Sequence, residues 1–272
     1  MNEETSNPDS NIKSTIDAVT GLAKAIPVYQ DAIQPSAKQI GKSLETVTKT
    51  VNIALAPIKA LVWGYEQIEQ FVTNKIAEKL RKLPPENIVT PSLQIAGPAF
   101  EALRYAGHDD NLRELFANLL ATSMDKDTIH KAHPAYVEII KNLCPDEAIL
   151  LNAVIKENTY PMIKIQAHNK NIMMGYQEMH PMYTHLDEIA PIKRRDFIPT
   201  YINNLCRLGI LEALSDIYII DPNIYEPLEN DEKLNDLKKL IERTDRNVIF
   251  KRGIIRTTPF GLQFVNNVVI EK

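Results

Sequence analysis

The chain has 272 residues, of which 44% are apolar and 24% charged, and its formal net charge is -4. This length and balance exclude wholesale disorder and exclude a small fold that needs metals or disulfides to hold it together. The weakly negative charge gives no overall attraction to nucleic acid, so such binding would need a local basic patch. Nine glycines against 17 prolines favour helices with sharp ends.

The two cysteines, Cys144 and Cys206, lie far apart in sequence and inside apolar helical patterns. This placement favours small core residues in a reducing compartment over a disulfide or a thiolate metal site. The first residues are polar and acidic and lack the basic and then apolar layout of a secretory signal. We therefore expect the protein in the cytoplasm.

Residues 1–11 are predicted to form a flexible tail, because they offer no apolar surface to bury. Residues 12–82 are predicted to form an amphipathic helical region. From Ile33 onward, apolar side chains recur every seventh residue and again four residues later, which is an a/d-like seam. Prolines and glycines interrupt this seam, so kinked helices are expected rather than one rigid coiled coil.

The most apolar part of this region lies between Lys49 and Glu66, where Lys59 is the only charged residue. The run is shorter than the roughly 20 apolar residues of a spanning helix. Two interpretations stay open: a helix that faces the core or another copy of the chain, and an interfacial helix at the inner face of the membrane. The side chains expected at such a contact are Ile58, Leu61, Trp63 and Tyr65.

Residues 83–144 are predicted to form a central helical hub. Pro98 is suited to the first turn of one helix, and Gly107 closes it. Asp109 or Asp110 can cap the next helix, which has the widest apolar face in the chain.

Two further helices are predicted to begin at prolines, since proline is favoured at the first helical position. The first begins at Pro134 and directs Tyr136, Ile140 and Leu143 to one side. The second begins at Pro145, where two carboxylates, Asp146 and Glu147, lie at the positive end of the helix dipole.

Four stretches between about residues 88 and 151 carry a resemblance to a known family: "IVTPSLQIAGPAFEALRY", "RELFANLLATSMD", "HPAYVEIIKNL" and "PDEAILL". In this order they resemble the abortive infection alpha family of bacteria. The resemblance implies a link to phage defence, in which an infected cell stops growing or dies before the phage matures. It brings no catalytic residues to carry over. Tyr136 stands where the family motif His-Pro-Ala-Phe has phenylalanine, a change that keeps an aromatic ring.

Residues 145–272 are predicted to form a winged-helix-like α+β part with an inserted segment at 221–247. After a first helix we expect a short strand in "YPMIKIQA" and a polar loop that carries His168, His180 and His185. A helix that ends at Gly209 leads into the strand "ILEAL", and "IYII" and "NVIFKRGIIRTT" are predicted as further strands. Thr258 caps a final helix. The chain as a whole is thus expected to be mostly α.

The winged-helix layout raises DNA binding as an alternative function. On the helix before Gly209, Asn203, Asn204 and Arg207 would face outward and suit the reading of base edges. The cations expected to neutralise phosphates are Arg194, Arg195 and Arg252. Acidic residues flank the same region, and winged helices also serve as protein-interaction modules. Protein contact or self-association is therefore favoured over DNA.

No reactive grouping is recognisable in the sequence. His130 and His133 lack the helical HExxH spacing of zinc hydrolases, no GxSxG elbow is present, and the glycines are scattered singly. We expect no cofactor, no metal and no enzymatic activity, with an uncharacterised hydrolase as the least supported alternative. The resulting hypothesis is an anti-phage protein that acts through protein or membrane contacts.

Overall fold

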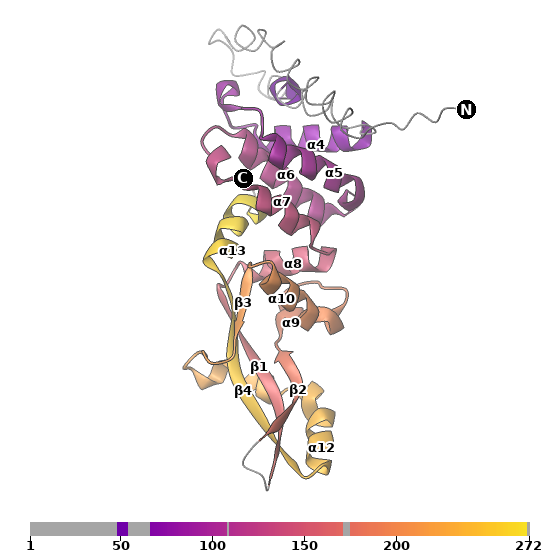
Figure 1. The fold of residues 1–272 in the computed structure, drawn as a ribbon, viewed down its shortest axis with the longest axis vertical. Coiled ribbons are helices and arrows are strands. Elements are labelled where there is room, and N and C mark those ends of the chain that lie inside the picture. Colours follow the sequence, from indigo (N-terminus) through magenta and orange to yellow (C-terminus); the bar gives the residue numbers. More distant parts are fainter. Residues whose placement is uncertain (1–47, 54–65, 108, 171–174, 271–272) are drawn as a thin grey trace, which may run out of the picture.

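The computed structural model describes residues 48–53, 66–107, 109–170 and 175–270. Helices gather at one end of the molecule, and a sheet with its own helices forms the other end, with α8 (Pro145–Val154) and α10 (Ile198–Arg207) between the two (Figure 1). The expected tail at 1–11 and most of the helical region expected at 12–82 lie outside the described residues.

The helical end is built around α6 (Asp110–Met124), which is buried along nearly its whole length. As predicted, Asp109 caps this helix: its carboxylate accepts hydrogen bonds from the backbone N–H groups of Asn111 and Leu112, at 3.0 and 3.1 Å. The α-helices that pack against α6 are α4 (Glu66–Lys79), α5 (Leu93–Ala106), α7 (Pro134–Lys141) and α8.

Helix α5 begins earlier than predicted. Ser92 is its N-cap and accepts a hydrogen bond from the backbone N–H of Gln94, so Pro98 lies inside the helix and not in its first turn. A proline there removes one helical hydrogen bond. The helix continues because apolar residues on both sides of the proline, among them Ile95 and Phe100, are buried against the hub.

The two helices predicted to begin at prolines do so. Helix α7 begins at Pro134, and its N-cap His133 accepts a hydrogen bond from the backbone N–H of Ala135 through Nδ1. Tyr136 is buried in this helix, as predicted from its spacing. Helix α8 begins at Pro145.

The segment after α8 is a long hairpin, which corrects the prediction of a short strand and a polar loop. Strand β1 (Thr159–Asn169) pairs antiparallel with β2 (Tyr176–Tyr183), so His168 and His180 lie on strands. Strand β2 is at the edge of the sheet, where a proline such as Pro181 and polar side chains are tolerated. Its composition therefore resembled that of a loop.

The described strands form one antiparallel sheet with the order β2-β1-β4-β3. Strand β4 (Arg246–Thr257) is the predicted strand "NVIFKRGIIRTT" and runs along the whole of β1. Helix α10 leads through Gly209, at φ +74°, into β3 (Leu211–Leu214), also as predicted.

The stretch "IYII" (217–220) is not a strand, contrary to the prediction. The backbone N–H of Ile219 donates to the hydroxyl of Tyr225 at 3.0 Å and not to a neighbouring strand. β-branched residues favour a strand only where a partner strand is available, and here the chain leaves the sheet.

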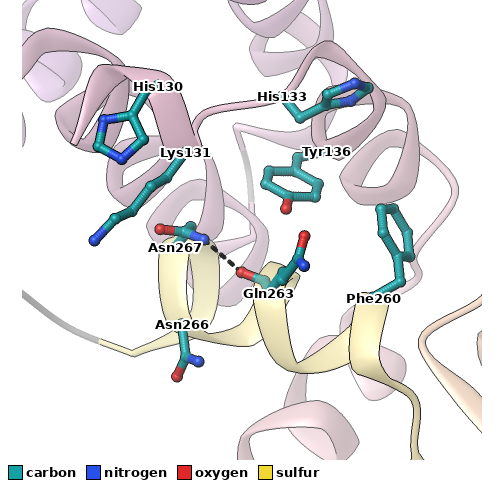
Figure 2. A pocket seen from close by; sticks show the side chains of 8 residues that line it. All are labelled: His130, Lys131, His133, Tyr136, Phe260, Gln263, Asn266 and Asn267. Atoms are coloured by element: carbon teal, nitrogen blue, oxygen red, sulfur yellow. Dashed lines mark hydrogen bonds between the residues drawn. The ribbon is translucent and has the colours of Figure 1, made fainter.

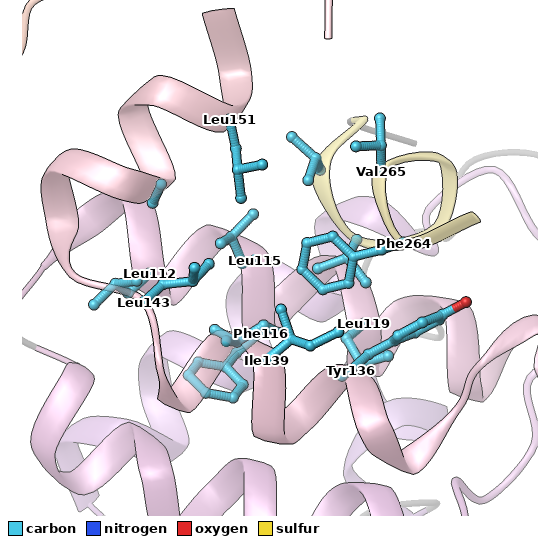
Figure 3. Close-up of a cluster of buried hydrophobic side chains, with 14 of the residues drawn as sticks. Leu112, Leu115, Phe116, Leu119, Tyr136, Ile139, Leu143, Leu151, Phe264 and Val265 are labelled. Carbon is cyan, nitrogen blue, oxygen red and sulfur yellow. The ribbon is translucent and has the colours of Figure 1, made fainter. Parts of the chain in front are cut away.

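The C-terminal segment returns from the sheet to the helical end (Figure 1). Thr258 caps α13 (Pro259–Phe264), as predicted, and a π-helical turn, η6 (Val265–Val269), follows. Figure 3 shows Phe264 and Val265 among the leucines of α6. The final residues therefore complete the hub core, although they are far from it in sequence.

A second, smaller core lies under the distal half of the sheet. It is closed by α11 (Glu226–Glu229) and α12 (Asn235–Arg243), which fall within the insertion expected at 221–247. Its buried members are Ile163, Ile165, Ala167, Tyr225, Leu228, Leu234 and Ile241. The described chain is thus mostly helical with an α+β C-terminal part, as expected.

Candidate functional site

Helix α10 carries three of the residues predicted to contact DNA. Asn203 is exposed, but the Asn204 amide donates to Glu147 Oε1 at 2.8 Å and to the Asn142 carbonyl at 2.9 Å. Arg207 donates to Asn204 Oδ1 through Nε and Nη2, at 3.1 and 2.7 Å. Asn204 and Arg207 therefore hold α10 against the start of α8.

The other cations predicted to bind phosphate lie beside carboxylates. Arg194 Nη2 is 2.9 Å from Asp196 Oδ2, and Arg195 Nη1 is 3.8 Å from Asp187 Oδ2. These acidic partners cancel much of the local positive field.

Arg252 lies apart from this pair, on β4. It binds Glu229 of α11 through two hydrogen bonds of 2.6 and 2.9 Å. Such a bidentate pair fixes the guanidinium plane, so Arg252 holds α11 on the sheet.

The residues predicted to contact a membrane or another copy, Ile58, Leu61, Trp63 and Tyr65, lie outside the described residues. In the described part of the chain, no helix combines the length and the apolar content that crossing a bilayer requires.

Asp146 has a role that its position at a helix N-terminus did not reveal. It is 6% exposed and accepts hydrogen bonds from the backbone N–H groups of Lys193 and Arg194 and from the Tyr201 hydroxyl. Burial raises the pKa of this carboxyl, but these three donors outweigh burial and lower it. The carboxylate thus fastens the segment before α10 to α8.

A loop at residues 216–224, named here the apolar loop, leaves the sheet after β3 and presents large apolar side chains to solvent. Ile217, Tyr218 and Ile220 are 47%, 57% and 91% exposed. Isolated exposed apolar residues are common, whereas here three large ones fall within four consecutive positions. The loop contains the stretch "IYII" (217–220), which was predicted to be a strand.

Tyr225 anchors the apolar loop to the sheet. Its fully buried side chain accepts a hydrogen bond from the backbone N–H of Ile219 and donates one to the carbonyl of Gly253 on β4, at 3.0 and 2.9 Å. The loop is therefore held in one place by a buried group, and its exposed side chains are presented from a fixed base.

A pocket opens where η2 (Ile129–Lys131) and the start of α7 face the C-terminal segment; it is named here the junction pocket (Figure 2). Its volume is about 520 Å³. Its lining residues are His130, Lys131, His133, Tyr136, Phe260, Gln263, Asn266 and Asn267. The lining combines aromatic rings, amides and basic groups, and it includes no carboxylate.

The sequence assigned His130 and His133 a structural role. His133 has one, since it caps α7, and both histidines also line the junction pocket. The described residues contain no group of three or more His, Cys, Asp or Glu side chains that would hold a metal ion. Nothing in the sequence placed Phe260 or Asn267 opposite the histidines, because the pocket depends on the return of the C-terminal segment.

A hydrogen-bonded cluster joins the hairpin to the insertion. Asp231 Oδ2 accepts a 2.5 Å hydrogen bond from the Tyr183 hydroxyl and lies 2.7 Å from His185 Nε2. Burial raises the pKa of the Asp231 carboxyl, but hydrogen bonds from Tyr183, the Lys233 backbone and His185 lower it to about 2. The cluster thus keeps a partly buried carboxylate ionised.

Comparison with known proteins gives one family and one structural neighbour. The sequence model of the family described as "Abortive infection alpha" matches residues 64–268. Among solved structures, the chain resembles an uncharacterized protein from the hydrocarbon-degrading marine bacterium Alcanivorax borkumensis SK2. The identity is 19%, the likeness covers 50% of this chain and 93% of that chain, and the TM-score is 0.35, too low to support a shared function. No curated protein matches.

Proposed function

Since this chain belongs to the abortive infection alpha family, we propose that it is a bacterial anti-phage defence protein of the abortive infection type. We further propose that it acts through contacts and not through catalysis. The family supports the defence context, and the apolar loop supports the mode of action.

The exposed side chains of the apolar loop are the observation that carries action by contact. A large apolar side chain contributes about 1.5–3 kcal/mol when a partner buries it fully. Ile217, Tyr218 and Ile220 supply three such exposed side chains within four consecutive positions, and Tyr225 holds the backbone between them at Ile219. Anchors presented from a fixed base lose little conformational entropy on binding.

Charge around the apolar loop favours a protein partner. Asp216 and Asp221 bracket its exposed anchors, and both are exposed. Asp216 is paired with Lys251 at 2.8 Å. The carboxylates of Asp216 and Asp221 beside the exposed apolar side chains oppose the approach of an anionic lipid surface or of nucleic acid. The proposed site of action is the cytoplasm, with contact at the inner membrane assigned to Ile58, Leu61, Trp63 and Tyr65 as a separate hypothesis.

The second candidate, a winged-helix DNA-binding regulator, has less support. Its proposed reading residues Asn204 and Arg207 are engaged with α8 and with each other. Its proposed phosphate contacts Arg194 and Arg252 each face a carboxylate. Binding DNA would require these partners to be exchanged for phosphate.

The test is phage challenge of a host that expresses the full chain, with culture survival, phage yield and membrane potential followed together. We expect the wild-type chain to reduce phage yield while infected cells stop growing. The triple variant Ile217→Ser, Tyr218→Ser, Ile220→Ser should lose this protection without losing the fold, because all three side chains are exposed.

A matched control replaces two exposed apolar residues elsewhere, Leu240→Ser and Ile249→Ser, which are 52% and 44% exposed. This control should protect as the wild type does. Full protection by the triple variant would refute the role of the apolar loop. Absence of protection by the wild type against every phage tested would refute the defence function itself.

A further inference from the structure

We propose that the junction pocket binds a nucleotide, a small molecule that joins a phosphate group to a planar base. The pocket is formed by the hub and the C-terminal segment, whereas the apolar loop extends from the sheet. The inference therefore goes beyond the proposed function and is tested separately from it.

One wall of the pocket suits a phosphate. It carries His130, Lys131 and His133, in a chain of net charge -4, and the lining holds no acidic side chain. Lys131 has no ion-pair partner within the described ranges. His133 accepts a backbone hydrogen bond through Nδ1, which places its ring proton on Nε2 and makes that nitrogen a donor. Lysine and imidazole donors are groups that bind phosphate oxygens.

The floor of the pocket presents the hydroxyl group of an otherwise buried tyrosine. Tyr136 is 3% exposed, and its ring packs against Phe264 with centroids 5.5 Å apart. Its hydroxyl lies in the pocket and has no hydrogen-bond partner within the part of the chain that the structure describes (Figure 2). Because no protein group of the described chain engages it, this hydroxyl is free to donate to an acceptor atom of a ligand in the pocket.

The opposite wall suits a planar base. The ring of Phe260 is 37% exposed, and its centroid lies 5.9 Å from that of Tyr136. An exposed ring offers a stacking face worth about 1–3 kcal/mol to a nucleic-acid base. Gln263 and Asn266 supply amides of the kind that hydrogen-bond to base edges.

The wall that carries these amides is held rigidly from behind. The π-helical turn η6 presents its carbonyl groups to α6, where the Asn118 amide donates to Val268 at 2.9 Å and the Thr122 hydroxyl donates to Asn267 at 2.8 Å. π-helical turns are frequent at functional sites. A volume of about 520 Å³ is within the range of small-molecule sites and accommodates one nucleotide.

The chemistry of the lining selects among ligand classes. A simple anion would use the basic wall and leave the Phe260 ring uncovered. An apolar molecule would leave the Tyr136 hydroxyl and the basic groups without acceptors, at a cost in free energy. A ligand with both a phosphate and a base satisfies both walls.

The test is isothermal titration calorimetry of the full chain with the four ribonucleoside monophosphates and the corresponding triphosphates. Inorganic phosphate and the unphosphorylated nucleosides serve as separate probes. We expect saturable one-site binding of at least one nucleotide. Inorganic phosphate and the unphosphorylated nucleosides should each bind with an affinity at least tenfold weaker. A short single-stranded oligonucleotide is a further probe. If it bound more tightly than every nucleotide, the proposal would be overturned, because the ligand of the pocket would then be the end of a nucleic-acid strand.

Three variants locate the binding. Tyr136→Phe removes the hydroxyl and keeps the packed ring, and it should weaken binding about threefold to tenfold. Lys131→Ala should weaken it by a similar factor and reduce its salt dependence. Phe260→Ala should weaken it between about fivefold and a hundredfold.

The matched control is Lys126→Ala, an exposed lysine in the same joint that does not line the pocket. Its affinity should equal that of the wild type, and the thermal unfolding of every variant checks that the fold is retained. Failure of all nucleotides to bind, or equal affinity in Tyr136→Phe, Lys131→Ala and the control, would overturn the proposal.

Discussion

The hydroxyl of Tyr201 on α10 donates a 3.0 Å hydrogen bond to the carboxylate of Asp146 at the start of α8, 55 positions earlier in the chain. Asp146 also accepts from the backbone N–H groups of Lys193 and Arg194. The buried carboxylate of Asp146 therefore helps to join α8 to the segment before α10 and to α10 itself, the helix that leads into the sheet.

The first prediction concerns this carboxylate. Asp146→Ala leaves three donors without an acceptor, and we expect a loss of roughly 3 kcal/mol in the free energy of unfolding. Tyr201→Phe removes one of the three bonds and should cost about 1 kcal/mol. Urea denaturation measures both. The control Glu101→Ala, at an exposed position of α5, should change stability by less than about 0.5 kcal/mol, and an equal loss there would contradict the role of Asp146.

The second prediction concerns pH. Hydrogen bonds outweigh burial and lower the pKa of Asp231 in the folded state to about 2, against about 3.9 for an unperturbed aspartate. A lowered folded-state pKa stabilises the fold above pH ~4, and this stabilisation is lost as the pH falls toward ~2. Asp231→Asn should therefore cost about 2 kcal/mol at pH 7 and progressively less below pH ~4. Urea denaturation at a series of pH values measures this, and a cost that stays constant down to pH 3 would contradict it.

The third prediction compares two glycines. Gly209 has φ +74°, a left-handed conformation that ends α10, so Gly209→Ala should cost about 1–2 kcal/mol. Gly97 lies inside α5, and a Cβ atom there meets nothing within 4 Å. Gly97→Ala should therefore stabilise the protein by about 0.5–1 kcal/mol. Thermal denaturation should show melting temperatures that move in opposite directions, and shifts of the same sign would refute the assignment.

The fourth prediction tests the return of the C-terminal segment. Phe264 is fully buried in the hub core, so Phe264→Ala should cost about 3–5 kcal/mol. Leu262, on the same helix, is 39% exposed and provides the control, since Leu262→Ala should cost less than about 1 kcal/mol. Chemical denaturation distinguishes the two. Similar small losses would mean that the C-terminal segment is not part of the hub core.

Much of the local structure was predictable because it depends on neighbouring residues. The Asp109 cap, the helix start at Pro134, the turn at Gly209 and the Thr258 cap each follow from the conformational preference of one residue and its immediate neighbours. The family was also predictable from short stretches of the chain, and the match over residues 64–268 confirms it.

The errors lie where the outcome depends on partners distant in sequence. Strand β2 looked like a loop because its place at a sheet edge, and not its composition, makes it a strand. The stretch at 217–220 looked like a strand, but its Ile219 N–H donates to the Tyr225 hydroxyl, which is itself held by the carbonyl of Gly253, 28 positions further along the chain.

The sequence by itself determined most of the helix ends, the mostly helical class and the family of this protein, because caps, proline positions and apolar spacing act over a few residues. Only the tertiary structure decided that Asp146 binds Tyr201, that Ile220 is exposed, and that Phe260 and Tyr136 line one pocket. Those contacts join segments tens to more than a hundred positions apart, and their energies arise only when the chain has closed on itself.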